Sequence, residues 1–464
     1  MEIAHVKIPI SNYLLQYVTD KSAPSLVFGN ILNLLKDGCW ETPEMVDTLE
    51  MLLQHGAQGR DVQVALILSG SACNASRLAR HFVGILLNYN VDINYDQGRP
   101  LQIAAENADI NILSIMIAKG ATTDSLCMAF PHIFRAEPRA EEAKMLSLIQ
   151  LFQEYAGDQL SNGDVRPRIT DPAVFMSIAV YPESCRILES ILDAGFPVDE
   201  KMYHDLPGLG NVSTTPLYWA LLDNQSVTEP VIHLLLKRGA SVEGHPSPLL
   251  HLAINKRYSS IVQLLIEAGA DVDAANHENV TPLSLAYQRN DLETMKALLA
   301  AECEPDDGTL HEAARRLDFK ATELLLEHDH DPNRPSPEHE GRGALAELCN
   351  QAPVYAQRSS DKNLERDVKK TIKALIKGGA RTNIQTKTAD DFEKSVLLLA
   401  LDSENPLVMT KAFLDSDQWK YVNEDFNLFT DGEYTFSPAM YVEKGMWEGE
   451  PCQVAGVLNL LKSK

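Results

Sequence analysis

The chain has 464 residues, of which 45% are hydrophobic and 23% are charged, and its formal net charge is −24. This composition is typical of a folded soluble protein and excludes a largely disordered chain. The acidic charge argues against nucleic acid or an anionic membrane as the partner. Since no apolar run approaches the roughly 20 residues that span a bilayer, we expect no membrane segment.

The seven cysteines are scattered, and no two have the C-x-x-C spacing of a metal site. The N-terminal sequence lacks the basic and apolar regions of a secretory signal. We therefore expect reduced thiols and a cytoplasmic protein, with the nucleus as the alternative location.

The first half of the chain predicts short helices. Residues 1–44 hold apolar stretches at helical spacing, and we expect a helical N-terminal cap there. Residues 45–121 predict two or three helix pairs. From 122 to 214 the pattern is less regular, and its Gly- and Pro-rich part at 203–214 predicts an extended hairpin.

Three similar phrases follow in the region 215–414. They are PLLHLAINKRYSSIVQLLIEAGADVD at 248–273, VTPLSLAYQRNDLETMKALLAAECEPD at 280–306 and GTLHEAARRLDFKATELLLEHDHDPN at 308–333. In the second phrase, Thr281 is placed to cap a helix that Pro282 begins. A second helix with leucines at helical spacing follows, and then loop residues. Each phrase therefore predicts two antiparallel helices and a turn.

A unit of two short helices cannot close a core alone, so it needs a similar neighbour on each side. The interval from Gly239 to Gly269 is 30 residues and that from Gly269 to Cys303 is 34, near the roughly 33-residue period of one solenoid class. The phrases TPLSLA at 281, TPLYWA at 215 and LLIEAGADVD at 264 resemble the ankyrin-repeat family. The resemblance implies an all-α ankyrin solenoid, curved and monomeric, of about nine or ten repeats with irregular insertions and terminal caps.

The sequence departs from the family pattern in several places. Cys303, Asp329 and Asn90 stand where the resemblance implies a left-handed glycine at the helix end. An insertion is expected at 334–368, followed by an outer helix that is longer than usual. Residues 415–464 are aromatic-rich, and we expect a C-terminal cap that does not repeat the pattern. This segment also resembles the end of ankyrin regions in large fungal proteins.

No catalytic motif is found. The chain has neither a phosphate loop nor a nucleophile elbow, and His311 has no second histidine at zincin spacing. The resemblance implies instead that His311 bonds the backbone between repeats. His328 and His330 could suggest a metal, but the resemblance places them at a hairpin. We therefore predict no catalytic residue, no metal and no cofactor.

The candidate binding residues come from the resemblance, which implies a groove lined by the ends of the first helices and by the hairpin tips. The candidates are Tyr218, Trp219, Asp223, Asn255, Lys256, Gln288, Arg289, Arg315 and Arg316. The basic members recur at one repeat position in an acidic chain, which favours an acidic segment of a protein partner. The alternatives are that these are ordinary solvated helix ends and that Trp219 belongs to the core.

These patterns favour a protein-binding scaffold. The alternative is an enzyme or small-molecule-binding protein with a pocket in the irregular 122–214 region or in the C-terminal cap.

Overall fold

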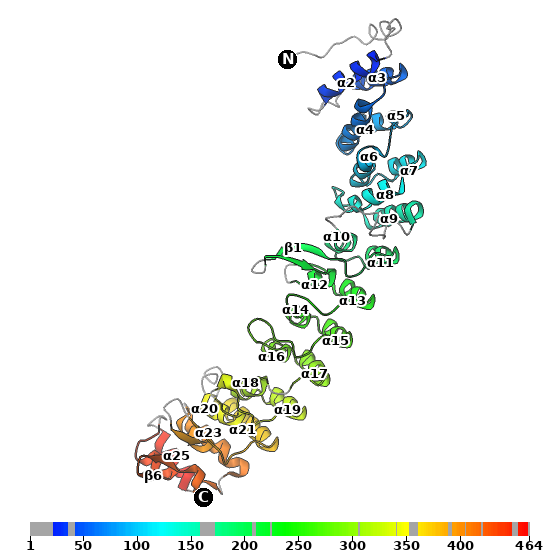
Figure 1. The fold of residues 1–464 in the computed structure, drawn as a ribbon. Helices are drawn as coiled ribbons and strands as arrows, with labels where there is room; N and C mark the ends of the chain where they lie inside the picture. Colours follow the sequence, from blue (N-terminus) through cyan, green and yellow to red (C-terminus); the bar gives the residue numbers. More distant parts are fainter. Residues whose placement is uncertain are drawn as a thin grey trace. The chain divides into compact units, whose positions relative to one another are not determined.

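The chain divides into two compact units, Met1–Ser241 and Val242–Lys464. Figure 1 shows helix pairs that follow one another in chain order within each unit. The structure is a computed structural model, and it describes residues 22–35, 42–157, 172–206, 210–222, 225–304, 307–339, 341–351, 361–387, 392–403, 405–418, 421–447 and 453–462.

The first unit holds six helix pairs in its described part and one two-stranded hairpin. Its helices are α2 (Ala23–Leu35), α3 (Pro43–Gln54), α4 (Arg60–Ala72), α5 (Arg77–Leu86), α6 (Tyr95–Glu106), α7 (Ile110–Ala118), α8 (Thr123–Ala129), the 3-10 helix η1 (Phe130–Arg135), α9 (Glu142–Ala156), α10 (Ala173–Val180), α11 (Cys185–Asp193), α12 (Pro216–Leu221) and α13 (Glu229–Lys237). Strands β1 (Met202–Leu206) and β2 (Gly210–Thr214) pair antiparallel, which confirms the extended hairpin predicted at 203–214.

The second unit also holds six helix pairs in its described part. Its helices are α14 (Leu249–Asn255), α15 (Ser259–Glu267), α16 (Pro282–Gln288), α17 (Leu292–Ala300), α18 (Thr309–Arg315), α19 (Phe319–Glu327), η3 (Pro337–His339), α20 (Ala344–Gln351), α21 (Asp361–Lys377), α22 (Val396–Asp402), α23 (Pro406–Phe413), the π-helical turn η5 (Leu414–Gln418), η7 (Asp425–Asn427), α24 (Pro438–Glu443) and α25 (Val454–Lys462). Two antiparallel hairpins are made by β3 (Gln385–Lys387) with β4 (Glu393–Ser395), and by β5 (Phe429–Asp431) with β6 (Tyr434–Phe436). The described helix pairs thus number twelve, more than the nine or ten repeats predicted.

Side chains cap both helices of the α16–α17 pair. The Thr281 hydroxyl accepts a hydrogen bond from the Ser284 N–H at the start of α16, where Pro282 follows as predicted. The Asp291 carboxylate accepts from the Thr294 N–H at the start of α17. These caps satisfy backbone donors that a short helix otherwise leaves unpaired.

Neighbouring pairs pack helix on like helix. In the second unit the first helices form one row, with α14, α16, α18, α20, α22 and α24 each packed on the next. The second helices form a parallel row from α15 through α17, α19, α21 and α23 to α25. The leucines that the repeats share are buried between the rows, as predicted for Leu265 and Leu298. This is an all-α ankyrin solenoid.

The left-handed residue at the helix end differs from two of the three positions predicted. Asp329 has φ 63° as expected, but after α17 the left-handed residue is Glu302 with φ 56°, and neither Cys303 nor Asn90 is left-handed. Cys303 comes one residue later and is buried, in the place that Ala270 takes after Gly269. A small apolar side chain fits that position. The left-handed residues Gly269 and Glu302 are 33 residues apart, which matches the period of the repeat.

Two regions predicted to be irregular contain helices that belong to regular pairs. The segment 334–368 holds α20, which packs between α18 and α22, and the first residues of the long α21. Within 415–464, Ser437 caps α24 and Pro438 begins it, as Thr281 and Pro282 do for α16. Helices α24 and α25 pack on α22 and α23, so the helix-pair pattern extends into the segment predicted as a non-repeating cap.

We predict that Leu298→Ala lowers the free energy of unfolding by about 2–5 kcal/mol, because a fully buried leucine is replaced by a cavity. Leu292→Ala on the same helix is the control. The Leu292 side chain is 40% exposed, so we expect a loss of less than about 1 kcal/mol. Denaturant titration followed by circular dichroism measures both changes, and equal losses would contradict this packing.

Candidate functional site

Three basic residues occupy one structural position in successive repeats. Lys256, Arg289 and Arg316 are the C-cap residues of α14, α16 and α18. We call these three residues the cation row. A helix C-terminus carries partial negative charge, which a nearby cation stabilises. Local electrostatics therefore favours a basic residue here whether or not a partner binds.

Both arginines of the cation row reach back to the preceding repeat. The Arg289 Nη2 donates a hydrogen bond to the Asn255 Oδ1 at 2.8 Å. The Arg316 guanidinium lies 5.5 Å from the ring centre of Tyr287, within the range of a cation–π contact. The predicted recurrence is present in the structure, and its members also connect one repeat to the next.

The Glu312 carboxylate accepts hydrogen bonds from two arginines at the α18 end of the cation row. Arg315 donates from Nε to Glu312 Oε2 at 2.7 Å and from Nη2 to Oε1 at 2.8 Å, while Arg316 Nε donates to Oε1 at 2.5 Å. Two guanidinium groups thus share the charge of Glu312, and the formal sum of the three side chains is one positive charge. Gln288 is exposed beside Arg289.

Tyr218 does not lie at the surface, contrary to the prediction. It is the third residue of α12, the position that His251 and His311 hold in α14 and α18, and only 1% of it is exposed. That position faces the interior between repeats, so its ring is unavailable to a partner. Trp219 is half-buried, with its ring 6.1 Å from that of Phe175. Asp223 lies outside the described residues.

The two repeat histidines join helices to hairpins. The Nε2–H of His251 donates to the Val280 carbonyl at 2.8 Å, and that of His311 donates to the Arg334 carbonyl at 3.0 Å. This confirms the backbone-bonding role predicted for His311. Burial lowers the pKa of both imidazoles below 6.5, and at His311 the neighbouring His339 lowers it further.

A buried polar cluster lies beside His311 and was missed from the sequence. Arg342 donates to Glu347 at 2.8 Å with both side chains buried, and His339 Nδ1 lies 3.4 Å from the same carboxylate. Burial alone would raise the pKa of Glu347, but the contacts with His339 and Arg342 outweigh it and lower the pKa. The cluster fixes the turn before α20, in the segment predicted as an insertion. Its sequence signal was the alternation of charge with His and Gly at 338–343.

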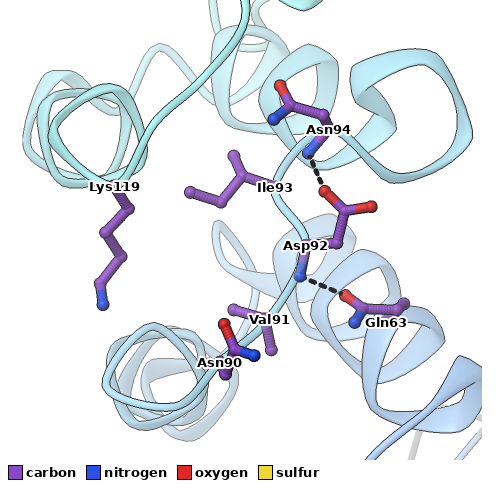
Figure 2. A pocket seen from close by; sticks show the side chains of 7 residues that line it. All are labelled: Gln63, Asn90, Val91, Asp92, Ile93, Asn94 and Lys119. Carbon is purple, nitrogen blue, oxygen red and sulfur yellow. Dashed lines mark hydrogen bonds between the residues drawn. The ribbon is translucent and has the colours of Figure 1, made fainter.

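A hollow of about 360 Å³ lies beside the segment that follows α5 (Figure 2). Its lining is Gln63, Asn90, Val91, Asp92, Ile93, Asn94 and Lys119. The Asp92 N–H donates to Gln63 Oε1 and the Asn94 N–H donates to Asp92 Oδ1, both at 2.9 Å. These polar groups shape the loop itself. The hollow lies outside both regions, 122–214 and the C-terminal segment, in which a ligand pocket was considered.

Asn94 belongs to a recurring clamp. Its Nδ2 donates to the Gly120 carbonyl at 3.1 Å, and its Oδ1 accepts from the Thr122 N–H at 2.8 Å. Asn333 makes the same pair of bonds to Gly379 and Arg381. The side chain after the outer helix therefore holds the corresponding turn of the next repeat.

Two further observations concern the described part of the chain. None of its helices is both long and apolar enough to cross a bilayer. No group of three or more His, Cys, Asp or Glu side chains there is arranged to hold a metal ion.

The comparisons with known proteins agree with this architecture. Residues 250–336 match the family described as ankyrin repeats in three copies. Residues 250–336 are therefore ankyrin repeats. The chain is 40% identical over 82 residues to palmitoyltransferase ZDHHC17 of Danio rerio, and the match covers 17% of this chain and 13% of that protein. It is 35% identical over 120 residues to ankyrin repeat and SOCS box protein 5 of Oryctolagus cuniculus, 25% of this chain and 32% of the other.

The chain thus spans about a third or less of these curated relatives. Among solved structures, the ankyrin repeat domain of Bcl-3 has a TM-score of 0.38 and 21% identity, over 53% of this chain and 98% of that domain.

We predict that Asn94→Ala destabilises the first unit by about 1–3 kcal/mol, because two main-chain groups of the next repeat lose their partner. Asn90→Ala is the matched control. Asn90 lines the same hollow and is exposed, so we expect little change. Thermal melts of the two variants make the comparison, and an Asn90 effect as large as that of Asn94 would refute the clamp.

We also predict a loss of stability as the pH falls below about 6.5, the ordinary pKa of histidine. The unfolded chain takes up protons on His251 and His311 at higher pH than the folded chain, because their folded pKa values are lowered. Their neutral rings therefore stabilise the fold above that pH, and the contribution is lost below it. The double variant His251→Gln, His311→Gln should show a flatter melting temperature between pH 7 and 5. The exposed His277→Gln should follow the unmodified chain.

Proposed function

We propose that this ankyrin-repeat protein is a scaffold that binds an acidic segment of another protein. The segment would lie along the C-terminal ends of the first helices α14, α16 and α18 in the second unit. The observation that carries the proposal is the cation row. Lys256, Arg289 and Arg316 hold one structural position in three successive repeats of a chain with net charge −24. The helices that carry them pack on one another, and charges reinforce one another when they lie within about one Debye length, roughly 8 Å at physiological salt.

Packing does not fill these positions. Arg289 and Arg316 are exposed, whereas the apolar residues six positions earlier in each repeat, Leu283 and Leu310, are buried. The repeat fold can therefore vary the helix-end residues without losing its core. Ankyrin repeats in general serve as protein-interaction modules, and a partner that reads the helix ends fits this division.

Glu312 limits how strongly the cation row can bind an acidic partner. Its carboxylate already engages Arg315 and Arg316, so an acidic partner would compete with it for the same donors. Charge-assisted contacts of this kind mainly control association rate and salt sensitivity. We therefore propose a modest affinity that depends on salt.

We propose no catalytic role for the chain. We propose a monomer that acts in the cytoplasm, without a cofactor. The match covers 13% of the Danio rerio palmitoyltransferase, so it does not support that activity for this chain.

Glu312→Gln is the decisive variant. It removes the competing carboxylate while both arginines remain, so we expect binding of a labelled Glu-Ser-Glu-Ser-Glu peptide to tighten by about two- to five-fold at low salt. Arg289→Gln with Arg316→Gln should weaken the same binding by about five-fold or more, and high salt should reduce both effects. Fluorescence anisotropy gives the dissociation constants.

A charge-matched control is available on the outer helices. Lys296→Gln with Lys320→Gln removes two exposed positive charges from α17 and α19. If this pair weakens peptide binding as much as the cation-row pair does, the attraction is general and the cation row is not the site. Thermal melts confirm that each variant is folded. The same variants then test any partner purified with the tagged chain.

A further inference from the structure

The last hairpin of the described chain presents an aromatic face. In the β5–β6 register Phe429 pairs with Phe436, and Asp431 pairs with Tyr434. Side chains two residues apart in a strand share a face, so these four side chains lie on one side of the hairpin. The two strands join through a tight turn in which Gly432 has φ 59°.

The base of this hairpin is fixed to the helices. Phe429 is buried, and its ring centre lies 4.8 Å from that of Tyr441 in α24 and 5.4 Å from that of Phe392. The Tyr441 hydroxyl donates to the Asp402 carboxylate, which also accepts from Lys394 at 2.7 Å. The hairpin therefore rests on an aromatic and ionic support that holds its outer part in place.

The outer part of the same face is exposed. Tyr434 is 72% exposed and Phe392 is 37% exposed, although large aromatic side chains usually gain free energy by burial. Phe436 is half-buried beside them, with its ring centre 6.5 Å from that of Phe429. A pre-positioned aromatic platform of this kind is typical of an interface anchor.

Three carboxylates neighbour the aromatic residues in the sequence or in the strand register. Glu393 follows Phe392, Asp431 pairs with Tyr434 and Glu433 lies in the turn before Tyr434, and all three are exposed. Within the described part of the chain, no side-chain hydrogen bond or ion pair involves them. The adjacent Lys394 is buried and engaged with Asp402. The exposed surface is therefore aromatic and negative, with its carboxylates available.

We propose that this acidic aromatic hairpin, formed by Phe392, Glu393, Asp431, Glu433, Tyr434 and Phe436, binds an arginine-containing basic segment of a partner protein. A guanidinium group can stack on the exposed aromatic rings while its N–H groups donate to the carboxylates. Arginine suits the surface better than lysine, because its planar group makes both contacts at once.

The negative charge of the acidic aromatic hairpin favours a basic partner over a neutral or an acidic one. A neutral apolar partner would bury the three carboxylates without partners, which costs free energy. An acidic segment or an anionic lipid surface would be repelled. The inference does not rest on the proposed function, because it concerns a different surface of the second unit with the opposite charge.

The test uses the full chain and the fluorescently labelled peptide Gly-Arg-Gly-Arg-Gly, with anisotropy as the readout at low and high salt. Tyr434→Ser removes the platform, and Asp431→Asn with Glu433→Gln removes two charges with little change of shape. We expect each variant to weaken binding by about five-fold or more. The same peptide with citrulline in place of arginine should bind the unmodified chain far more weakly, and the lysine peptide should fall between them.

Two controls separate this site from general attraction. Glu293→Gln with Glu327→Gln removes two exposed carboxylates from the outer helices α17 and α19, and it should change binding by less than about two-fold. Arg289→Gln with Arg316→Gln should not weaken it, so failure of this site and failure of the cation row are distinguishable. Equal losses in the outer-helix control, an unchanged affinity for Tyr434→Ser, or no binding to the unmodified chain would each overturn the proposal. Because Tyr434 is largely exposed, a melting curve should show its variant folded.

Discussion

A helix pair of this chain cannot bury both of its apolar faces without the next pair. Helices α14 and α16 belong to one row and α15 and α17 to the other, and each row continues through the described part of the unit to α24 and α25. Stability is therefore built between neighbours along the chain. The residues that repeat are those that this stacking needs, such as Leu265 and Leu298, and the residues that vary are those that it leaves exposed.

Polar contacts then attach the hairpins to the stacked helices. The Nε2–H of His251 and of His311 donates to a hairpin carbonyl, while Asn94 and Asn333 clamp the turn of the following repeat. Each bond is local to one pair of repeats, so hairpins of different length can be added without disturbing the rows. That freedom explains how the β5–β6 hairpin can present Tyr434 to solvent while its base stays buried.

The charge of the chain is arranged more finely than its net value indicates. Cations gather at the ends of α14, α16 and α18, where helix electrostatics favours them, and Glu312 partly neutralises them. Carboxylates gather at the last hairpin beside exposed aromatic rings. The second unit thus carries two surfaces of opposite sign. The net charge of −24 does not reveal that these two surfaces differ in sign. Of the two, the acidic aromatic hairpin combines charge with exposed aromatic area.

The sequence by itself determined the repeated helix pair, its Thr281–Pro282 cap, the buried leucines and the recurrence of Lys256, Arg289 and Arg316, because these follow from local hydrogen bonding and from the period of apolar residues. It could not determine that Tyr218 is buried, since that depends on which side of α12 the neighbouring repeat covers. Helix α20 within 334–368 and helices α24 and α25 within 415–464 also required the tertiary structure, because the first helices α20, α22 and α24 do not follow one another at the repeat period. The same is true of the acidic aromatic hairpin, whose residues Phe392 and Tyr434 are 42 positions apart and are brought to one support only by packing around Phe429 and Tyr441.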